Sequence, residues 1–117
     1  MASDPIRILI VDDDEEALIA LERLLEEEGY STVTAWGGKE ALALSDQGKF
    51  DLLLVDEHGA DVSFDTLLAE LRRRQPSALP LVMHSGRGHS LNTIIHHTVC
   101  KWKHAEVTAG IRRYLAA

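Results

Sequence analysis

Short apolar runs alternate along this chain with longer segments of helical period, and this alternation constrains the fold more than any other feature. Residues 6–11 and 50–55 form apolar runs, interrupted only by Arg7 and Asp51, which are typical of strands buried on both faces of a parallel sheet. Weaker strand patterns lie at residues 31–36, 81–84 and 98–100. The sequence therefore predicts five strands.

The segments between these runs are predicted to be helical. In residues 15–28 apolar side chains recur at helical spacing and glutamates fill the opposite face. Gly29 follows, where a left-handed C-terminal cap is expected. Further helices are predicted at residues 39–46, 65–74, 90–96 and 105–115. Pro76 and Pro80 are expected to bracket the turn before the fourth strand.

This order predicts an α/β fold with a doubly wound, five-stranded parallel sheet. Helices are expected on both faces, because right-handed crossovers place them there. Ligands of such sheets bind outside the carboxyl ends of the strands, where the strand order reverses. Asp12 and Asp13 follow the first strand, and Asp56 follows the third. If these strands are neighbours, the three carboxylates converge on one crevice.

Three converging carboxylates indicate a bound cation, because they cannot all stay ionised without one. Oxygen ligands from a few side chains suit Mg²⁺ and leave room for water and phosphate. A carboxylate can also attack a phosphoryl group and form an acyl phosphate. Ser85, at the end of the fourth strand, can supply a hydroxyl group, and Lys101, at the end of the fifth, can supply a positive charge.

The composition limits the classes of function. The chain has 117 residues, 45% hydrophobic and 26% charged, which fits one compact globular domain over residues 1–117 with a core at about 6–115. Its net charge of −7 argues against direct binding to nucleic acid or to an anionic membrane. Cys100 is the single cysteine, and no segment resembles a signal peptide or a membrane span. A cytoplasmic protein is expected.

Four motifs, in order, carry a family resemblance. They are Val11-Asp12-Asp13, Leu53-Leu54-Val55-Asp56, Val82-Met83-His84-Ser85-Gly86 and Val99-Cys100-Lys101. Together they resemble the receiver domain of two-component response regulators over residues 6–115. The resemblance implies a flavodoxin-like strand order of 2-1-3-4-5, for which a chemotaxis receiver is a known example.

The resemblance also implies a role for each site residue. Asp56 would accept a phosphoryl group from a histidine kinase or histidine phosphotransfer protein. Asp13, Asp56 and the backbone carbonyl of His58 would bind Mg²⁺ directly, and Asp12 would act through water. Ser85 and Lys101 would contact the phosphoryl oxygens. The side chains of His58 and Arg87 would flank the path of the water that hydrolyses the acyl phosphate, and would so affect the rate of self-catalysed dephosphorylation.

The chain departs from the family pattern in four places. Residues 57–64 replace the usual Met-Pro turn and glycine, Trp102 stands where proline follows the lysine, and Thr98 stands where an aromatic residue commonly switches. Only fifteen residues separate Ser85 from Lys101. The region of the fourth helix is therefore expected to be shortened and the output region to diverge, with a local response to phosphorylation rather than the usual coupled switch.

Several alternatives remain open. The pair Asp12 and Asp13, taken alone, could cap a helix. A second group could bind Zn²⁺ but is more readily explained as a partly exposed histidine-rich edge, and it consists of His96, His97, Cys100 and His104. The whole chain could be a pseudo-receiver that binds proteins without phosphorylation, while a flavin carrier is disfavoured because the aspartates would repel phosphate. A stand-alone domain and a piece of a larger regulator or hybrid kinase are both consistent with the sequence. A downstream target or effector domain and a homodimer are open as partners, and no conventional enzyme is expected beyond self-catalysed phosphorylation and dephosphorylation.

Overall fold

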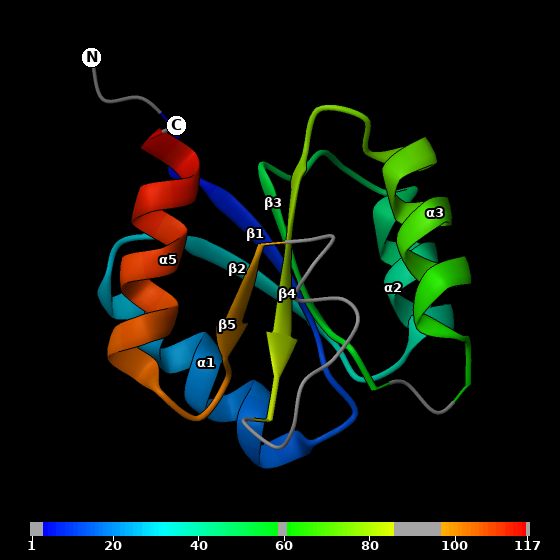
Figure 1. Ribbon diagram of the computed structural model, residues 1–117. Helices are drawn as coiled ribbons and strands as arrows, with labels where there is room; N and C mark the ends of the chain where they lie inside the picture. Colours follow the sequence, from blue (N-terminus) through cyan, green and yellow to red (C-terminus); the bar gives the residue numbers. More distant parts are fainter. Residues whose placement is uncertain (1–3, 59–60, 86–96, 117) are drawn as a thin grey trace.

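The computed structural model describes residues 4–58, 61–85 and 97–116 (Figure 1). The elements in these ranges are β1 (Arg7–Val11), α1 (Glu15–Glu27), β2 (Ser31–Ala35), α2 (Gly38–Ser45), β3 (Leu52–Asp56), α3 (Phe64–Arg74), β4 (Leu79–His84), β5 (Thr98–Cys100) and α5 (His104–Ala116). The strands form one parallel sheet of order β2-β1-β3-β4-β5. The predicted fold class and strand order are thus confirmed.

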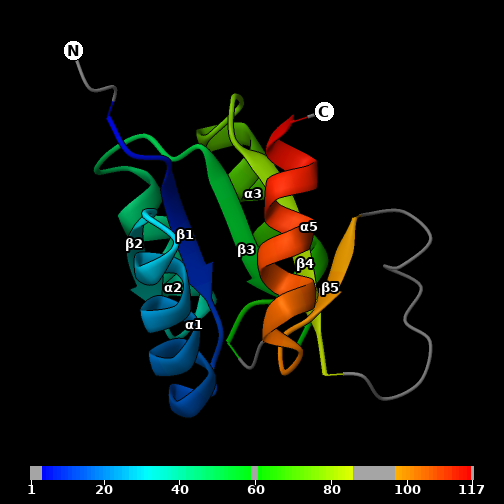
Figure 2. The same ribbon diagram turned by 90° about the vertical axis from the view of Figure 1, so that its left-hand side faces the viewer.

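Helices cover both faces of the sheet, as Figures 1 and 2 show. α1 and α5 pack on one face, and α2 and α3 pack on the other. β1 lies between β2 and β3, although β2 precedes β3 in the chain, so the strand order reverses beside β1. All strands are parallel, and their carboxyl ends therefore meet at one edge of the sheet, the lower edge in Figure 1.

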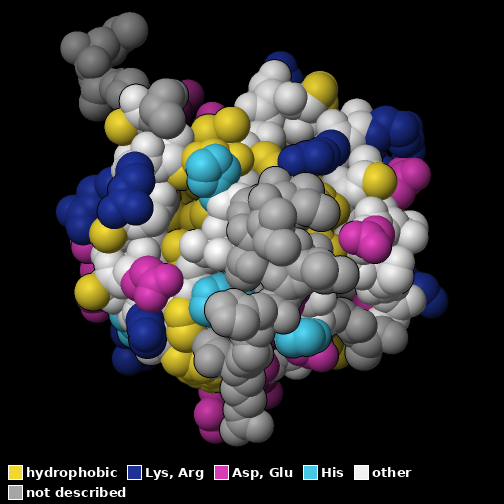
Figure 3. Space-filling view, in the orientation of Figure 1, with side chains coloured by type: hydrophobic (Ala, Val, Ile, Leu, Met, Phe, Trp, Pro, Cys, Tyr) yellow, Lys and Arg dark blue, Asp and Glu magenta, His cyan; other side chains and the backbone are white. Residues whose placement is uncertain are grey.

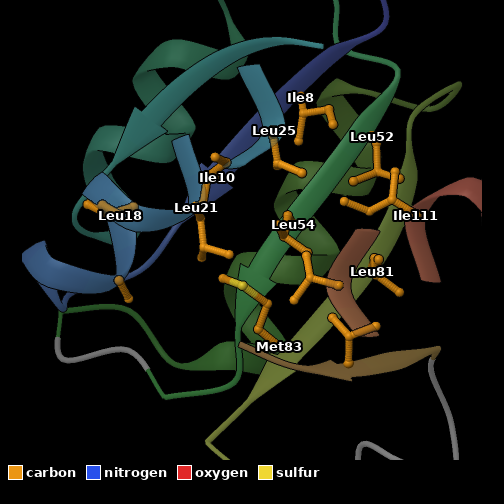
Figure 4. Close-up of a cluster of buried hydrophobic side chains, with 13 residues drawn as sticks. Ile8, Ile10, Leu18, Leu21, Leu25, Leu52, Leu54, Leu81, Met83 and Ile111 are labelled. Atoms are coloured by element: carbon orange, nitrogen blue, oxygen red, sulfur yellow. The ribbon is translucent and has the colours of Figure 1, made fainter. Parts of the chain in front are cut away.

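Alternate residues of the central strands feed two separate cores, because successive side chains of a strand point to opposite faces. Ile8 and Ile10 of β1 pack with α1 and α5 (Figure 4), whereas Leu9 and Val11 pack with α2 and α3. All five residues of β3 are buried. This two-sided burial explains why residues 8–11 of β1 and 52–55 of β3 are all apolar in the sequence.

Local residues set the helix ends. The Asp14 side chain caps α1 by accepting hydrogen bonds from the backbone N–H groups of Glu16 and Ala17, at 3.0 and 3.4 Å. After α1, Gly29 has φ +91°, the left-handed conformation that glycine adopts without strain, and this confirms the predicted cap. None of the described helices combines the length and apolar character that a bilayer crossing requires.

One boundary prediction is wrong. Pro80 does not belong to a turn but lies inside β4, which begins at Leu79 and pairs Pro80 with Leu53 of β3. β5 pairs with β4 only from Val82 onward, so no described strand lies beside Pro80 on that side to need its missing N–H. The predicted helix 90–96 and the shortened region of the fourth helix lie outside the described residues.

Candidate functional site

An acidic site lies where β1 and β3 end side by side. Asp12 directly follows β1, and its backbone N–H donates to the carbonyl of Ala35 at 3.0 Å, while Asp56 is the last residue of β3. Asp13 follows, with an exposed side chain. Carboxylate oxygens of Asp12, Asp13 and Asp56 all lie within 4.8 Å of one another. The predicted convergence of these three carboxylates is therefore confirmed.

Lys101 brings a cation into this site. Its backbone N–H donates to the carbonyl of His84 at 2.9 Å, which fixes the residue beside the end of β4. Its Nζ donates to Oδ1 and Oδ2 of Asp12 at 3.2 and 3.1 Å, and lies 3.5 Å from Oδ1 of Asp56. The Lys101 side chain is 8% exposed, so these ion pairs are buried. Lys101, rather than the nearby Lys103, is the lysine of the site.

Burial and charge perturb the ionisation of these groups. Burial raises the pKa of Asp56 from 3.8 to about 6, and the negative charge of Asp12 adds to the effect, while Lys101 and the N–H of His58 oppose it. Burial also raises the pKa of Asp12. Burial alone would lower the pKa of the Lys101 ammonium group, but the Asp56 and Asp12 carboxylates together raise it. The site therefore holds more negative charge than its one buried lysine neutralises.

The donor set fits a hard divalent cation. Among the described residues, no other group of three or more His, Cys, Asp or Glu side chains can hold a metal ion. Oδ1 of Asp56 is buried and accepts no hydrogen bond from the described part of the chain, so this oxygen keeps a lone pair for a ligand. Carboxylate oxygens are the ligands that Mg²⁺ prefers. In the space-filling view, acidic side chains are visible at this lower edge, and further acidic side chains lie at the left and right of the same face (Figure 3).

The other predicted site residues lie around this centre. Ser85 directly follows β4 and is half-buried. The backbone N–H of His58 donates to Oδ2 of Asp56 at 3.3 Å, and the His58 side chain is 74% exposed. Arg87 lies outside the described residues. Trp102 is 47% exposed and its ring centroid lies 5.4 Å from the Nζ of Lys101, a distance at which a cation and an aromatic ring attract each other.

The histidine and cysteine residues do not form a metal site among the described residues. Cys100 is buried, as expected of a small apolar side chain. His97 is exposed, and its ring lies 4.5 Å from that of Tyr114. His96 lies outside the described residues.

Sequence reasoning missed two acidic residues next to the site. The carboxylate of Asp61 accepts hydrogen bonds from the backbone N–H groups of Gly38 and Lys39, at 2.9 and 3.1 Å, and these bonds lower the pKa of Asp61. The side chain of Glu57 is only 5% exposed and lies 3.4 Å from Nε2 of His58. One signal pointed to Asp61: α2 begins with two glycines, which cannot cap the helix with their own side chains.

Comparison with known proteins agrees with the geometry. Residues 8–100 match the family model described as the response regulator receiver domain. Over 90 residues the chain is 39% identical to the transcriptional regulatory protein CpxR of Escherichia coli (strain K12), a match that covers 76% of this chain and 37% of CpxR. The chain therefore spans little more than a third of the length of this relative.

Solved structures share the whole fold. A receiver domain protein described as CheY-like, from Methanospirillum hungatei JF-1, superposes with a TM-score of 0.86 at 26% identity, covering 97% of this chain and 95% of that one. The response regulator protein TrrA from Thermotoga maritima, solved in complex with Mg(2+)-BeF, gives a TM-score of 0.80 at 26% identity, with 93% and 98% coverage. The family match, these likenesses and the acidic site agree: this chain belongs to the response regulator receiver domain family of two-component systems.

Proposed function

We propose that Asp56 accepts a phosphoryl group from a histidine kinase or histidine phosphotransfer protein in a Mg²⁺-dependent reaction. The observation that carries the proposal is the convergence of Asp12, Asp13 and Asp56 within 4.8 Å, with Lys101 ion-paired in the same site. The family match over residues 8–100, which includes Asp12, Asp13 and Asp56, supports the proposal. The phosphoryl donor, the downstream target or effector domain and a cytoplasmic location belong to the same proposal.

The chemistry follows from the environment of Asp56. Its carboxylate would attack the phosphorus atom, so that an oxygen–phosphorus bond forms while the bond to the donor imidazole breaks. A carboxylate with a raised pKa is a better nucleophile than an ordinary one, and at pH 7 it is still mostly ionised at a pKa of about 6. Its buried Oδ1 accepts no hydrogen bond from the described residues, and its contact with a described donor is the 3.5 Å ion pair with Nζ of Lys101.

Positive charge in the site would stabilise the transferred group. Asp13, Asp56 and the His58 carbonyl would hold Mg²⁺, and Asp12 would act through water. When bound, the ion supplies neutralisation of the charge on the phosphoryl oxygens. Lys101 would exchange its contact with Asp56 for a phosphoryl oxygen, and the Ser85 hydroxyl would donate to another. Ser85 follows the carboxyl end of β4, which lies beside β3, and Lys101 follows the carboxyl end of β5, on the far side of β4.

Loss of the phosphoryl group would be self-catalysed. Water must attack in line with the acyl phosphate bond, so side chains beside that path affect the rate. The exposed imidazole of His58 is two residues after Asp56, where it can order or block that water. Arg87 holds the matching place after Ser85 in the sequence. We expect His58→Ala or Arg87→Ala to change the lifetime of the phosphorylated domain several-fold.

A pseudo-receiver that ignores phosphate is the second candidate and is not favoured. Trp102 and Thr98 depart from the usual switch residues, but neither belongs to the acidic group that would hold the ion and the phosphoryl group.

The single-domain organisation over residues 1–117 also remains part of the proposal.

Intact mass spectrometry tests the function directly. After incubation with acetyl phosphate and MgCl₂, the wild-type domain should gain the mass of one phosphoryl group, and hydroxylamine should remove it. Asp56→Asn should gain nothing, and Asp13→Ala should lose both Mg²⁺ affinity and labelling. Asp65→Asn, which changes an exposed acid in the first turn of α3, is the matched control and should be labelled normally. Labelling of Asp56→Asn at the wild-type rate would overturn the proposal.

A further inference from the structure

A side chain of the β3–α3 loop, residues 57–63, is bonded to a helix that lies elsewhere in the sequence. The link is the carboxylate of Asp61, which accepts from the backbone N–H groups of Gly38 and Lys39 in the first turn of α2. We propose that this link, the Asp61 anchor, positions the β3–α3 loop so that the backbone carbonyl of His58 can serve the metal site. The inference rests on the proposed function, because it assumes Mg²⁺ at the acidic site.

The Asp61 anchor satisfies both partners. At the start of α2, the cap residue Gly37 makes no side-chain hydrogen bond, so the first N–H groups of the helix need an acceptor from elsewhere. Asp61 supplies two acceptor oxygens, one for each N–H, at 2.9 and 3.1 Å. A negative charge at a helix N-terminus is also favourable to the helix dipole. A single carboxylate therefore caps α2 and fixes the loop.

Two glycines make the close approach possible. A Cβ atom at Gly38 would lie 2.8 Å from Cβ of Val62, and one at Gly37 would lie 3.0 Å from Oδ2 of Asp61. Real Cβ contacts are essentially never shorter than 3.0 Å, so any side chain at position 38 would push the loop away. The φ of Gly37 is −170°, which any residue can adopt. Glycine is therefore needed at position 37 for its close packing against the loop and not for its backbone conformation.

The anchor limits where His58 can lie. The loop leaves β3 through two bonds, Glu57 N–H to the Met83 carbonyl and His58 N–H to Asp56 Oδ2. From His58 to Asp61 there are three residue steps, which span at most about 11 Å when extended. The sequence of this stretch contains no proline to restrict the backbone. Fixing Asp61 therefore lowers the conformational entropy of the loop before the ion binds, so that less entropy has to be lost on binding.

The anchor also lies beside the acidic site. Asp61 and Asp13 line the same hollow of about 330 Å³, together with Trp36, Gly37 and two other residues. The Asp61 anchor therefore faces the same hollow as Asp13, one of the residues that would hold Mg²⁺.

Mg²⁺ titration of a matched set of variants tests this inference. We expect Asp61→Ala to weaken Mg²⁺ binding about 3- to 10-fold by isothermal titration calorimetry, below the 10- to 100-fold typical of direct partners of metal ligands. The Mg²⁺ affinity of Asp61→Asn should lie between those of wild type and Asp61→Ala, because the amide oxygen of Asn still accepts one hydrogen bond. In the labelling assay with acetyl phosphate, Asp61→Ala should need more Mg²⁺ for half-maximal rate but reach the wild-type rate at saturation.

Ser63→Ala is the control, because Ser63 caps α3 at the other end of the same loop by accepting from the backbone N–H of Thr66. It removes a helix cap of comparable worth without touching Asp61, and its Mg²⁺ affinity should stay at the wild-type value. Wild-type affinity in Asp61→Ala, or equal weakening in Ser63→Ala, would overturn the anchor while leaving the proposed function intact. If the wild-type domain itself binds no Mg²⁺, the proposed function and the inference both fail.

Discussion

Replacement of Asp56 by a neutral residue should stabilise the metal-free domain. Burial, with help from the charge of Asp12, raises the pKa of Asp56 from 3.8 to about 6. At about 1.4 kcal/mol per pKa unit, keeping this carboxylate ionised in the folded state costs about 3 kcal/mol at neutral pH. Asn cannot recover all of this, because both carboxylate oxygens face donors, Lys101 Nζ and His58 N–H, and Asn has only one acceptor oxygen. We expect Asp56→Asn to gain about 1–2 kcal/mol at pH 7.5.

The pH dependence has a definite sign. Because the folded pKa of Asp56 exceeds the unfolded value, its stabilising contribution is full below about pH 4 and is lost as the pH rises through about 6. Asp56→Asn has no such titration. The difference in unfolding free energy between Asp56→Asn and wild type should therefore grow between pH 4.5 and 7.5 and level off above that.

Urea unfolding at a series of pH values, with EDTA and constant salt, measures this difference. Asp65→Asn removes an exposed carboxylate outside the acidic site and is the control for the change of net charge. Adding MgCl₂ at pH 7.5 should stabilise wild type more than Asp56→Asn and so reduce the gap. A mutant that is less stable than wild type at pH 7.5, or a gap that is constant with pH, would refute the reasoning.

Three further perturbations give separate tests. Lys101→Met leaves Asp12 and Asp56 without their buried cation, so the unfolding free energy of the metal-free domain should fall by about 3 kcal/mol at pH 7.5 in urea melts. The pKa of Asp56, followed by NMR titration, should rise further. An unchanged unfolding free energy would contradict a buried ion pair. Gln75→Leu removes three hydrogen bonds of a buried amide, to the Phe50 N–H and to the carbonyls of residues 45 and 48. At about 1 kcal/mol per bond, the free energy of unfolding should fall by about 2–4 kcal/mol in urea melts. A fall below about 1 kcal/mol would show that these bonds do not hold the segment 45–50 in place. In a Trp36→Phe background, beryllium fluoride with Mg²⁺ should change the fluorescence of Trp102, because Lys101 leaves the ring for the phosphoryl mimic; an unchanged spectrum would contradict that movement.

The central part of the fold could be predicted because it rests on local patterns. Residues 8–11 of β1 and 52–55 of β3 are apolar at every position, since both faces of these strands are buried there, and Asp12 and Asp56 mark where burial of apolar side chains ends. The convergence of the three aspartates then follows from parallel strands that end at one edge. The start of β4 was not predicted, because whether Pro80 interrupts a strand depends on whether β5 extends alongside it.

Contacts between distant residues set the limit of such reasoning. Asp61 lies 23 residues from Gly38, and no periodicity links the two positions. Lys101 could be identified only by its order after the third motif, and its contacts with Asp12 and Asp56 establish its place in the site. The response of residues 86–96 to phosphorylation stays a prediction, because these residues lie outside the described ranges.

The division of β1 between two cores has a consequence for how such a chain can change during evolution. Ile8 and Ile10 face α1 and α5, and Leu9 faces α2 and α3, so one inserted residue would exchange the two sets of side chains. It would also move Asp12 off the position at which it meets Asp56 and Lys101. Insertions and deletions are therefore expected between strands rather than within them, because there they leave the register of the described strands intact.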